Sequence, residues 1–308
     1  MSTRAVLVLN PAARHGTSRR RFAAVSELLH REFDLTTVET DLDGRWRDRL
    51  ASELRSDVPL VIAAGGDGTV GAVAAAVLDC PAGGRVALGA VGLGSSNDFH
   101  KPFRRVHGGV PLRIDRLGAR PRDVSRARYA SNGEAPRERV FVVSASIGVT
   151  ARANARFNEG RDALLALLKR RWVDGAVINA ALSAVLRHSN LPGFVRLDGE
   201  EHRVAISNLS VLKTPFLSGC LRYDTPVAPD SGLLAVNLCH GMDRAALVRV
   251  LVGLVRGRFA GRPQTRSWTT SGVEVELAEP APLELDGELT EARHVRFDVL
   301  PRRILACA

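Results

Sequence analysis

The sequence lacks any apolar stretch near the roughly 20 residues that a membrane-spanning helix requires. Its N-terminus also lacks a signal-peptide pattern. Only four cysteines occur in 308 residues, and they lie far apart without the spacing of a metal site, which favours reduced thiols. With a hydrophobic content of 45%, the chain can form a sizeable core. These features predict a cytoplasmic globular protein of one or two domains.

Lysine is scarce, with three residues (Lys101, Lys169 and Lys213), although the net charge is +10. The excess of arginine and alanine indicates a bias toward GC-rich codons rather than a selected basic patch. Basic clusters such as residues 19–21 and 169–171 lack the interleaved aromatic side chains that stack on bases. We therefore expect solvated basic faces and no nucleic-acid binding, with attraction to an anionic membrane surface or to ATP as the alternative.

No lysine-containing Walker loop is present, but the glycine-rich segment Gly65-Gly66-Asp67-Gly68-Thr69 lies between an apolar run at 60–64 and an alanine-rich run at 71–78. These runs predict a buried strand and a helix. Closely spaced glycines let backbone amides and the helix N-terminus face an anion. Thr69 adds a hydroxyl donor. Asp67, which has no evident structural task in a tight turn, could hold a metal or orient an acceptor. The alternative is a glycine-rich turn without a ligand.

The N-terminal part alternates strands and helices, which predicts parallel βαβ units. Strands are expected at 4–9, 35–40, 60–64 and 85–91, and helices at 20–31, 46–55 and 71–78. Ligands bind beyond the carboxyl ends of the strands in such sheets. Four loops follow these ends, at Asn10-Pro11, Thr40, 65–69 and 95–98. Their convergence at one edge predicts a nucleotide site.

From about residue 122 the pattern changes to strands without regular crossover helices, which predicts a mainly antiparallel β domain. Strands are expected at 140–149, 204–212, 233–239, 273–277, 294–300 and 303–307, and helices at 162–172, 175–188 and 244–255. The expected fold class is α/β, with a Rossmann-like parallel-sheet domain over 1–122 and a β-sandwich-like domain over 123–299. The helices at 162–172 and 175–188 either pack on the sheet or form a cover that touches a membrane.

The segment Gly65–Thr69 resembles the diacylglycerol kinase catalytic family, which includes bacterial lipid kinases and the sphingosine and ceramide kinases. NAD kinases carry the same five residues. The second loop is similar to the Pro-x-Gly-Thr-x-Asn-Asp motif of the lipid kinases, since it retains Gly94, Asn97 and Asp98 and keeps a hydroxyl at Ser95. NAD kinases lack this Asn-Asp pair in such a context, so the resemblance favours a lipid kinase. It also implies that residues 300–308 return to the first domain.

The resemblance implies an ATP site in the first domain, with Mg²⁺ bridging the phosphates near Asp67. Asn10 and Pro11 match the Asn-Pro-x-Ser-Gly motif of the family, although Ala13 replaces the serine. Asn10 could instead cap a turn, and a threonine at a strand end, as at Thr40, is unremarkable alone. The implied nucleotide-binding residues are Asn10, Pro11, Thr40, Gly65, Gly66, Asp67, Gly68, Thr69, Ser95, Asn97 and Asp98.

Residues 286–288 resemble the Asp-Gly-Glu motif of the family. The resemblance implies that Glu288 accepts the proton of a lipid hydroxyl and that Asp286 orients it, so the catalytic residues would be Glu288, Asp286 and Asp67. The alternative is an exposed hairpin turn, because Asp-Gly is a strong turn signal.

Residues 225–236 are similar to a family segment whose aspartate holds a structural Mg²⁺ with nearby backbone oxygens. Ser231 stands at that position and Ala235 at a later aspartate. Magnesium prefers carboxylate oxygens, so the site is retained only if Asp230 substitutes.

The function implied is an ATP- and Mg²⁺-dependent lipid kinase that phosphorylates diacylglycerol or a related lipid. It would be cytoplasmic, with transient contact to the inner face of the membrane, and a homodimer is left open. The alternatives are a kinase of a soluble hydroxyl substrate and a non-catalytic nucleotide-binding regulator. The second is favoured by departures from the family pattern at Gly71, Ser231 and Ala235.

Overall fold

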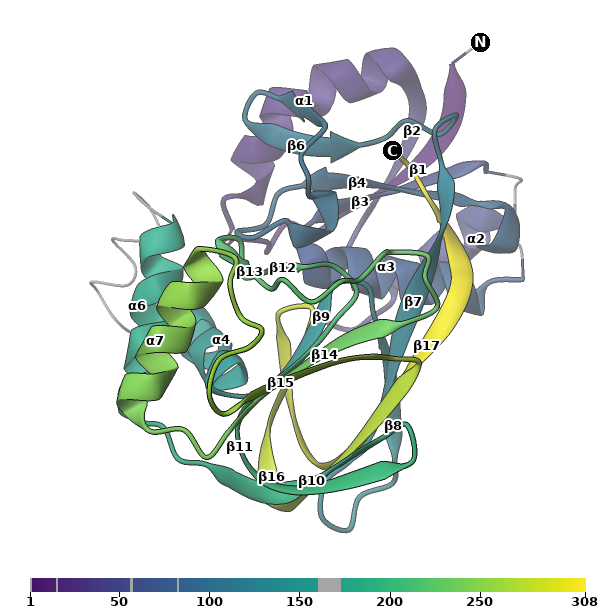
Figure 1. Cartoon of the computed structure of the whole chain (residues 1–308). Helices are drawn as coiled ribbons and strands as arrows, with labels where there is room; N and C mark the ends of the chain where they lie inside the picture. Colours follow the sequence, from purple (N-terminus) through teal and green to yellow (C-terminus); the bar gives the residue numbers. More distant parts are fainter. Residues whose placement is uncertain (1, 15, 56–57, 82, 160–172) are drawn as a thin grey trace. The chain divides into compact units, whose positions relative to one another are not determined.

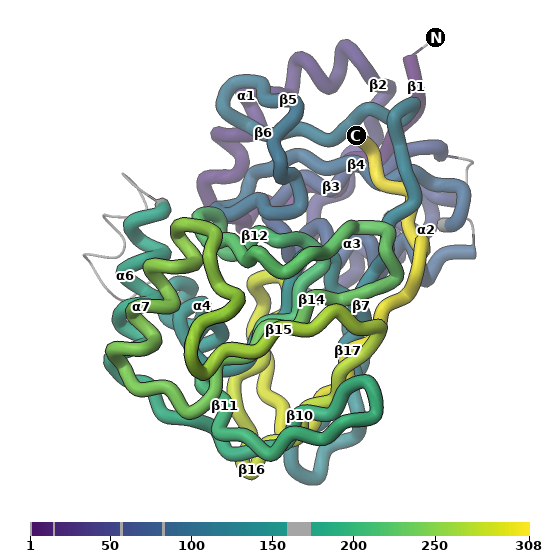
Figure 2. Tube along the Cα trace, in the orientation of Figure 1, coloured from purple at the N-terminus to yellow at the C-terminus, as the bar shows by residue number. Residues whose placement is uncertain are grey.

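The computed structural model describes residues 2–14, 16–55, 58–81, 83–159 and 173–308. The chain divides into two compact units, residues 1–124 with 301–308 (unit 1) and residues 125–300 (unit 2). It passes from one unit to the other within two strands, β7 (Arg120–Ala130) and β17 (Glu288–Ala306), which Figure 2 traces in teal and yellow. The observed division lies two residues beyond the boundary expected at 122.

Unit 1 contains four parallel strands in the order β2-β1-β3-β4. The end of β17 adds a fifth parallel strand, since Leu305 pairs with Ala87. Two antiparallel strands follow on β4, so the sheet is mixed and differs in this from the parallel sheet expected. The strands are β1 (Thr3–Leu9), β2 (Phe33–Glu39), β3 (Leu60–Gly65), β4 (Ala87–Gly92), β5 (Arg105–His107) and β6 (Val110–Arg113).

Helices cover both faces of this sheet (Figure 1). On one face, Val25 and Leu29 of α1 (Ser18–Glu32) share a core with Leu7 of β1 and Ile62 of β3. Side chains alternate along a strand, so Val6 and Val61 point to the other face. There α2 (Trp46–Leu54) and α3 (Asp67–Asp79) pack. Every residue of β3 and β4 is buried, which is why these strands have unbroken apolar sequences.

Unit 2 is rich in antiparallel sheet. In it β11 pairs with β14, β10 and β9, and β16 pairs with β10, β9 and β17. Its core contains Val195, Val211, Val236 and Phe297. The further strands are β8 (Arg137–Phe141), β9 (Ser144–Gly148), β10 (Leu191–Leu197), β11 (Glu200–Leu212), β12 (Phe216–Leu217), β13 (Leu221–Arg222), β14 (Leu234–His240), β15 (Thr265–Thr270) and β16 (Gly272–Leu285).

Four strand predictions beyond residue 122 need correction. The strand expected at 140–149 is interrupted at residues 142–143, where the backbone amides turn to a side chain of another segment. The strand expected at 273–277 continues to Leu285, and the two expected at 294–300 and 303–307 are one strand, β17.

Three helices of unit 2 are described: α4 (Val149–Glu159), α6 (Val173–Leu186) and α7 (Arg244–Val255). The sequence did not predict α4, and the helix expected at 162–172 lies outside the described residues. Asp243 caps α7 by accepting the backbone N–H of Ala246 over 2.7 Å. Among the described residues, no helix has an apolar stretch long enough to span a membrane.

Candidate functional site

The loops after the parallel strands of unit 1 meet at one sheet edge. The backbone N–H of Asn10 donates to Ala64 O over 2.9 Å, and that of Thr40 donates to Leu9 O over 2.9 Å. The N–H of Gly94 reaches Gly65 O over 3.1 Å. The structure therefore places all four loop segments that the sequence singled out side by side.

The glycine-rich segment is partly helical. The first turn of α3 begins at Asp67 and includes Thr69, with Gly66 as an extended N-cap residue that provides no side-chain cap. The amides of a first helical turn have no partner within the helix. The first turn of α3 therefore presents backbone N–H groups and the positive end of the helix dipole.

Two glycines bring together the backbones of the glycine-rich loop and the loop after β4. A Cβ atom built on Gly94 would lie 2.5 Å from Cα of Gly66, closer than real Cβ contacts allow. Because glycine has no Cβ, the two backbones can approach without a side chain between them. The result is direct backbone contact beside the N-terminus of α3, where residues 66–68 are half-buried.

Asn10 connects its loop to the same helix. Its Nδ2 donates to Thr69 Oγ1 over 3.0 Å, while its Oδ1 accepts the backbone N–H of Ala12 over 3.0 Å. The amide thus closes a local turn, as the alternative prediction held, and also orients the Thr69 hydroxyl. Pro11 and Thr40 are half-buried beside it.

Asp67 joins the two glycine loops. Its Oδ2 accepts the backbone N–H of Asp98 over 3.0 Å, and its Oδ1 accepts that of Phe99 over 2.9 Å. Asp67 therefore has a structural task, contrary to what its place in a tight turn predicted. Its partners lie about thirty residues away in sequence, so local turn chemistry could not indicate them.

The second loop is closed by its own polar side chains. Asn97, at a left-handed φ of 52°, accepts the N–H of Gly94 over 3.0 Å and donates back to Gly94 O over 3.2 Å. Asp98 is buried and forms an ion pair of 2.7 Å with Lys101. Ser95 is half-buried in the same loop. Asn97 and Asp98 thus shape the loop itself, and Lys101 is a partner that the sequence reasoning missed.

Two arginines add positive charge near these loops. Arg21 of α1 donates to Gly92 O over 3.1 Å and to Gly109 O over 3.3 Å. Burial of the guanidinium is the main cause that lowers the pKa of Arg21, and the positive charge of the nearby Arg14 lowers it further. The sequence did not separate Arg21 from the other arginines at 19–21. Its position on the inner side of α1 does.

His100 is buried beside the second loop. Burial, followed by the charge of Arg113, lowers its pKa to about 3, and Arg122 adds to the effect. The imidazole is therefore neutral at physiological pH.

In unit 2, Asp286 and Gly287 form the two-residue turn between β16 and β17, with φ of 48° and 92°. This is the geometry of an Asp-Gly hairpin. The Asp286 side chain is buried, not exposed as the turn alternative supposed. Its carboxylate accepts the N–H groups of Val142, Val143 and Ser144 over 2.7, 2.9 and 3.0 Å. Burial raises the pKa of Asp286 to about 7, although the three N–H donors act to lower it.

Residues that the sequence reasoning missed support this turn. Glu284 is buried, accepts Ser146 Oγ over 2.7 Å and accepts the Gly287 N–H over 2.5 Å. Asn154 of α4 donates to Gly287 O over 2.8 Å, and Asn158 donates to the same oxygen over 3.2 Å. The four-residue spacing of the two asparagines was the available signal, since it places them on one helix face.

Glu288 follows the turn and has a different environment. Its side chain is 51% exposed and forms an ion pair with Arg139. Of the two carboxylates in the Asp-Gly-Glu motif, Glu288 is therefore the accessible one, and Asp286 is fixed by backbone donors.

The segment predicted to hold a structural metal lies between β13 and β14. Asp230 is exposed there, and Ser231 donates its hydroxyl to Ala228 O over 2.9 Å. No group of three or more His, Cys, Asp or Glu side chains that could hold a metal occurs among the described residues.

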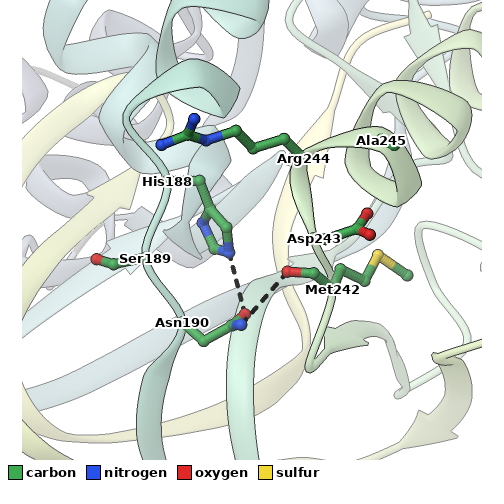
Figure 3. A pocket seen from close by; sticks show the side chains of 7 residues that line it. All are labelled: His188, Ser189, Asn190, Met242, Asp243, Arg244 and Ala245. Carbon is green, nitrogen blue, oxygen red and sulfur yellow. Dashed lines mark hydrogen bonds between the residues drawn. The ribbon is translucent and has the colours of Figure 1, made fainter.

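A separate surface pocket of 440 Å³ lies at the N-terminus of α7 (Figure 3). In it His188 Nε2 pairs with Asn190 Oδ1 over 3.0 Å, and Asn190 Nδ2 donates to Met242 O over 3.3 Å. These polar groups bind one another, and none of the predicted site residues lines the pocket. It is lined by His188, Ser189, Asn190, Met242, Asp243, Arg244 and Ala245.

Two family models match the chain. Residues 4–121 match the diacylglycerol kinase catalytic domain, and residues 143–307 match the YegS C-terminal NAD kinase beta sandwich-like domain. The search of curated proteins found no match. The first match supports kinase activity and does not identify the substrate.

Solved structures of similar fold come from Bacillus anthracis strain Sterne. A candidate diacylglycerol kinase superposes with a TM-score of 0.72 at 19% identity, covering 99% of this chain and 96% of that one. A diacylglycerol kinase from the same organism gives 0.67 at 18% identity, with the same coverage. These structures show that the fold is shared. The two family matches, which together cover most of the chain, show that it belongs to the diacylglycerol kinase catalytic family.

Proposed function

We propose that this protein is an ATP-dependent lipid kinase that transfers the γ-phosphate to a hydroxyl of diacylglycerol or a related lipid. The observation that carries the proposal is the edge of the unit 1 sheet, where Asp67 ties the glycine loop at the start of α3 to the loop at 92–98. Phosphates bind at helix N-termini where backbone amides are accessible, and a family match to a kinase domain covers these loops.

ATP fits the residues at this edge. Gly66 and Gly94 pack backbone to backbone beside the first turn of α3, so neither adds a side chain that would cover its amides. Thr69 supplies a hydroxyl that Asn10 orients. Arg21 adds positive charge, so no lysine of a Walker loop is required.

Mg²⁺ would be held through the nucleotide phosphates, with Asp67 as the protein carboxylate nearby. Each oxygen of Asp67 accepts a backbone N–H, so the carboxylate is held at the N-terminus of α3. Mg²⁺ commonly binds one or two carboxylates together with substrate phosphates. When bound, it neutralises charge on the transferred phosphoryl group.

Glu288 is the proposed general base. As the lipid hydroxyl oxygen bonds to the γ-phosphorus, the bond to ADP breaks and the hydroxyl proton passes to the Glu288 carboxylate. Asp286 is a positioning residue, because its three amide bonds fix the turn that carries Glu288.

We propose α6 and α7 as the surface that contacts the membrane. The two helices lie side by side in both views (Figures 1 and 2). Arg249 of α7 and Arg256, the residue that caps its C-terminus, are exposed and would attract anionic lipid. Both helices also expose apolar side chains, namely Leu182, Leu186, Val248, Val252 and Val255.

Vesicle sedimentation tests this surface. Leu186→Glu with Val252→Glu is expected to reduce binding to vesicles that contain anionic lipid. Leu117→Glu, an equally polar change at an exposed leucine of unit 1, is the matched control. Equal binding by all three proteins would contradict the assignment.

The activity is tested by incubating the protein with labelled ATP and a total lipid extract, followed by identification of the labelled species. The wild-type protein should label a hydroxyl-bearing lipid, and Glu288→Gln should not. Label that appears only on soluble alcohols would identify a kinase of a soluble substrate instead.

A non-catalytic nucleotide-binding regulator is the second candidate. Two observations favour it. The Asp67 carboxylate binds a backbone amide of the second loop, and the Glu288 carboxylate is paired with Arg139, so both side chains already have structural partners. This candidate predicts ATP binding by calorimetry without turnover of any lipid.

A further inference from the structure

Lys213 is a buried charged residue of unit 2 that the proposed reaction does not use. It follows the last residue of β11, and its backbone N–H donates to Val143 O over 2.9 Å. Its side chain is among the largest that are fully buried, with 1% exposure. A buried ammonium is costly unless acceptors surround it, so its partners are informative.

The acceptors are backbone oxygens of the loop between β13 and β14. Nζ of Lys213 donates to Leu233 O over 2.8 Å and to Ala228 O over 3.2 Å. Ala228 O also accepts the Ser231 hydroxyl over 2.9 Å, and the N–H of Leu233 donates to Ser231 Oγ over 3.3 Å. The buried Lys213 ammonium and the exposed Ser231 hydroxyl thus both bind backbone groups of residues 228–233.

A structural Mg²⁺, which the family resemblance implies for this loop, does not fit these residues. The family's metal ligand at position 231 is a carboxylate, whereas Ser231 has only a hydroxyl, and the neighbouring Asp230 is exposed. Ala228 O and Leu233 O already accept the Lys213 ammonium. A divalent ion at these oxygens would face a second positive charge within hydrogen-bonding distance of the same oxygens.

We propose that the Lys213 ammonium is the resident cation of this loop and replaces a divalent metal. The net charge of the loop supports this replacement. The Lys213 ammonium beside the neutral Ser231 hydroxyl carries one positive charge, as a divalent ion beside one carboxylate would. The ammonium donates hydrogen bonds where a metal would accept lone pairs, so the same carbonyl oxygens serve either cation. Unit 2 therefore needs no divalent metal to fold.

Thermal unfolding without nucleotide tests the proposal on the full chain. The wild-type Tm should be the same in EDTA and in Mg²⁺. Lys213→Ala should lower the Tm by about 5–10 °C, and Mg²⁺ should not restore it. Arg203→Met, which removes an exposed basic side chain of β11, is the control and should leave the Tm nearly unchanged.

Exchange of both residues should create the metal site. In Lys213→Ala with Ser231→Asp, Mg²⁺ at about 100 times its Kd should raise the Tm by about 5–10 °C relative to EDTA. Mn²⁺ titration followed by electron paramagnetic resonance should find one added site in the double variant compared with the wild-type protein. This readout is independent of kinase activity, so its result is separate from that of the lipid-labelling test.

Two results would overturn the proposal. One is a wild-type protein whose Tm falls in EDTA. The other is a double variant that binds no more Mn²⁺ than the wild-type protein. If Lys213→Ala fails to fold, the comparison of the wild-type Tm in EDTA and in Mg²⁺ still tests the proposal.

Discussion

Asp67 Oδ1 accepts the backbone N–H of Phe99 over 2.9 Å, and this bond, with its neighbour to Asp98, links the two loops of the proposed nucleotide site. The carboxylate therefore has a structural role whatever its part in binding Mg²⁺. Stability and nucleotide binding should depend on it together.

Asp67→Ala is expected to lower the free energy of unfolding by about 2 kcal/mol, because two backbone amides lose a charged acceptor. ATP affinity should fall as well, since the loops are no longer held together. Urea denaturation and calorimetry measure the two effects. Asp79→Ala, at the exposed end of the same helix, is the matched control. Unchanged stability in Asp67→Ala would refute the linking role.

The Asn10–Thr69 bond should be detectable as an energetic coupling. In a double-mutant cycle of Asn10→Ala and Thr69→Val, we expect a coupling of about 1 kcal/mol in stability, because each change removes the same hydrogen bond. Thr69→Ser retains the hydroxyl and should preserve ATP affinity better than Thr69→Val. Strictly additive effects would show that the bond contributes nothing.

Glu288→Gln should abolish lipid labelling while changing the free energy of unfolding by less than about 1 kcal/mol, because an exposed ion pair such as that with Arg139 contributes little. Glu291→Gln, also exposed on β17, should retain activity. Radiolabel transfer and urea denaturation supply the measurements. Full activity in Glu288→Gln would exclude this residue as the base.

His100 should make unit 1 sensitive to acid. Its pKa of about 3 in the folded protein lies below the ordinary 6.5, so the unfolded chain binds a proton first as the pH falls. Stability from this residue is present above about pH 6.5 and is lost progressively toward pH 3, by up to about 5 kcal/mol. The loss of stability between pH 7 and 4 should be smaller in His100→Leu than in the wild type. It should be unchanged in His107→Leu, at an exposed histidine of β5.

Asp286 should act in the opposite direction in unit 2. Because burial raises its pKa to about 7, the folded protein retains a proton that the unfolded chain releases near pH 4. Its contribution to stability therefore decreases as the pH rises from about 4 to 7, by up to about 4 kcal/mol. The difference in stability between wild type and Asp286→Asn should follow this slope, with Asp230→Asn as the exposed control. A flat difference would indicate that the three amide donors keep Asp286 ionised.

Hydrophobic patterning predicted the regular elements of unit 1 well. The strand expected at 60–64 is β3 and the helix expected at 46–55 is α2, each within one residue at either end. Strands β5 and β6 and helix α4 were missed, because short or polar segments form these elements through pairing and packing with residues distant in sequence.

The sequence by itself determined which loops follow the parallel strands, because apolar runs and glycines are local signals. It also determined that position 231 lacks a carboxylate. Only the tertiary structure decided what Asp67, Asp286 and Lys213 do. Their partners are backbone groups up to 144 residues away, and a backbone N–H or C=O has no side-chain identity that a sequence pattern could reveal.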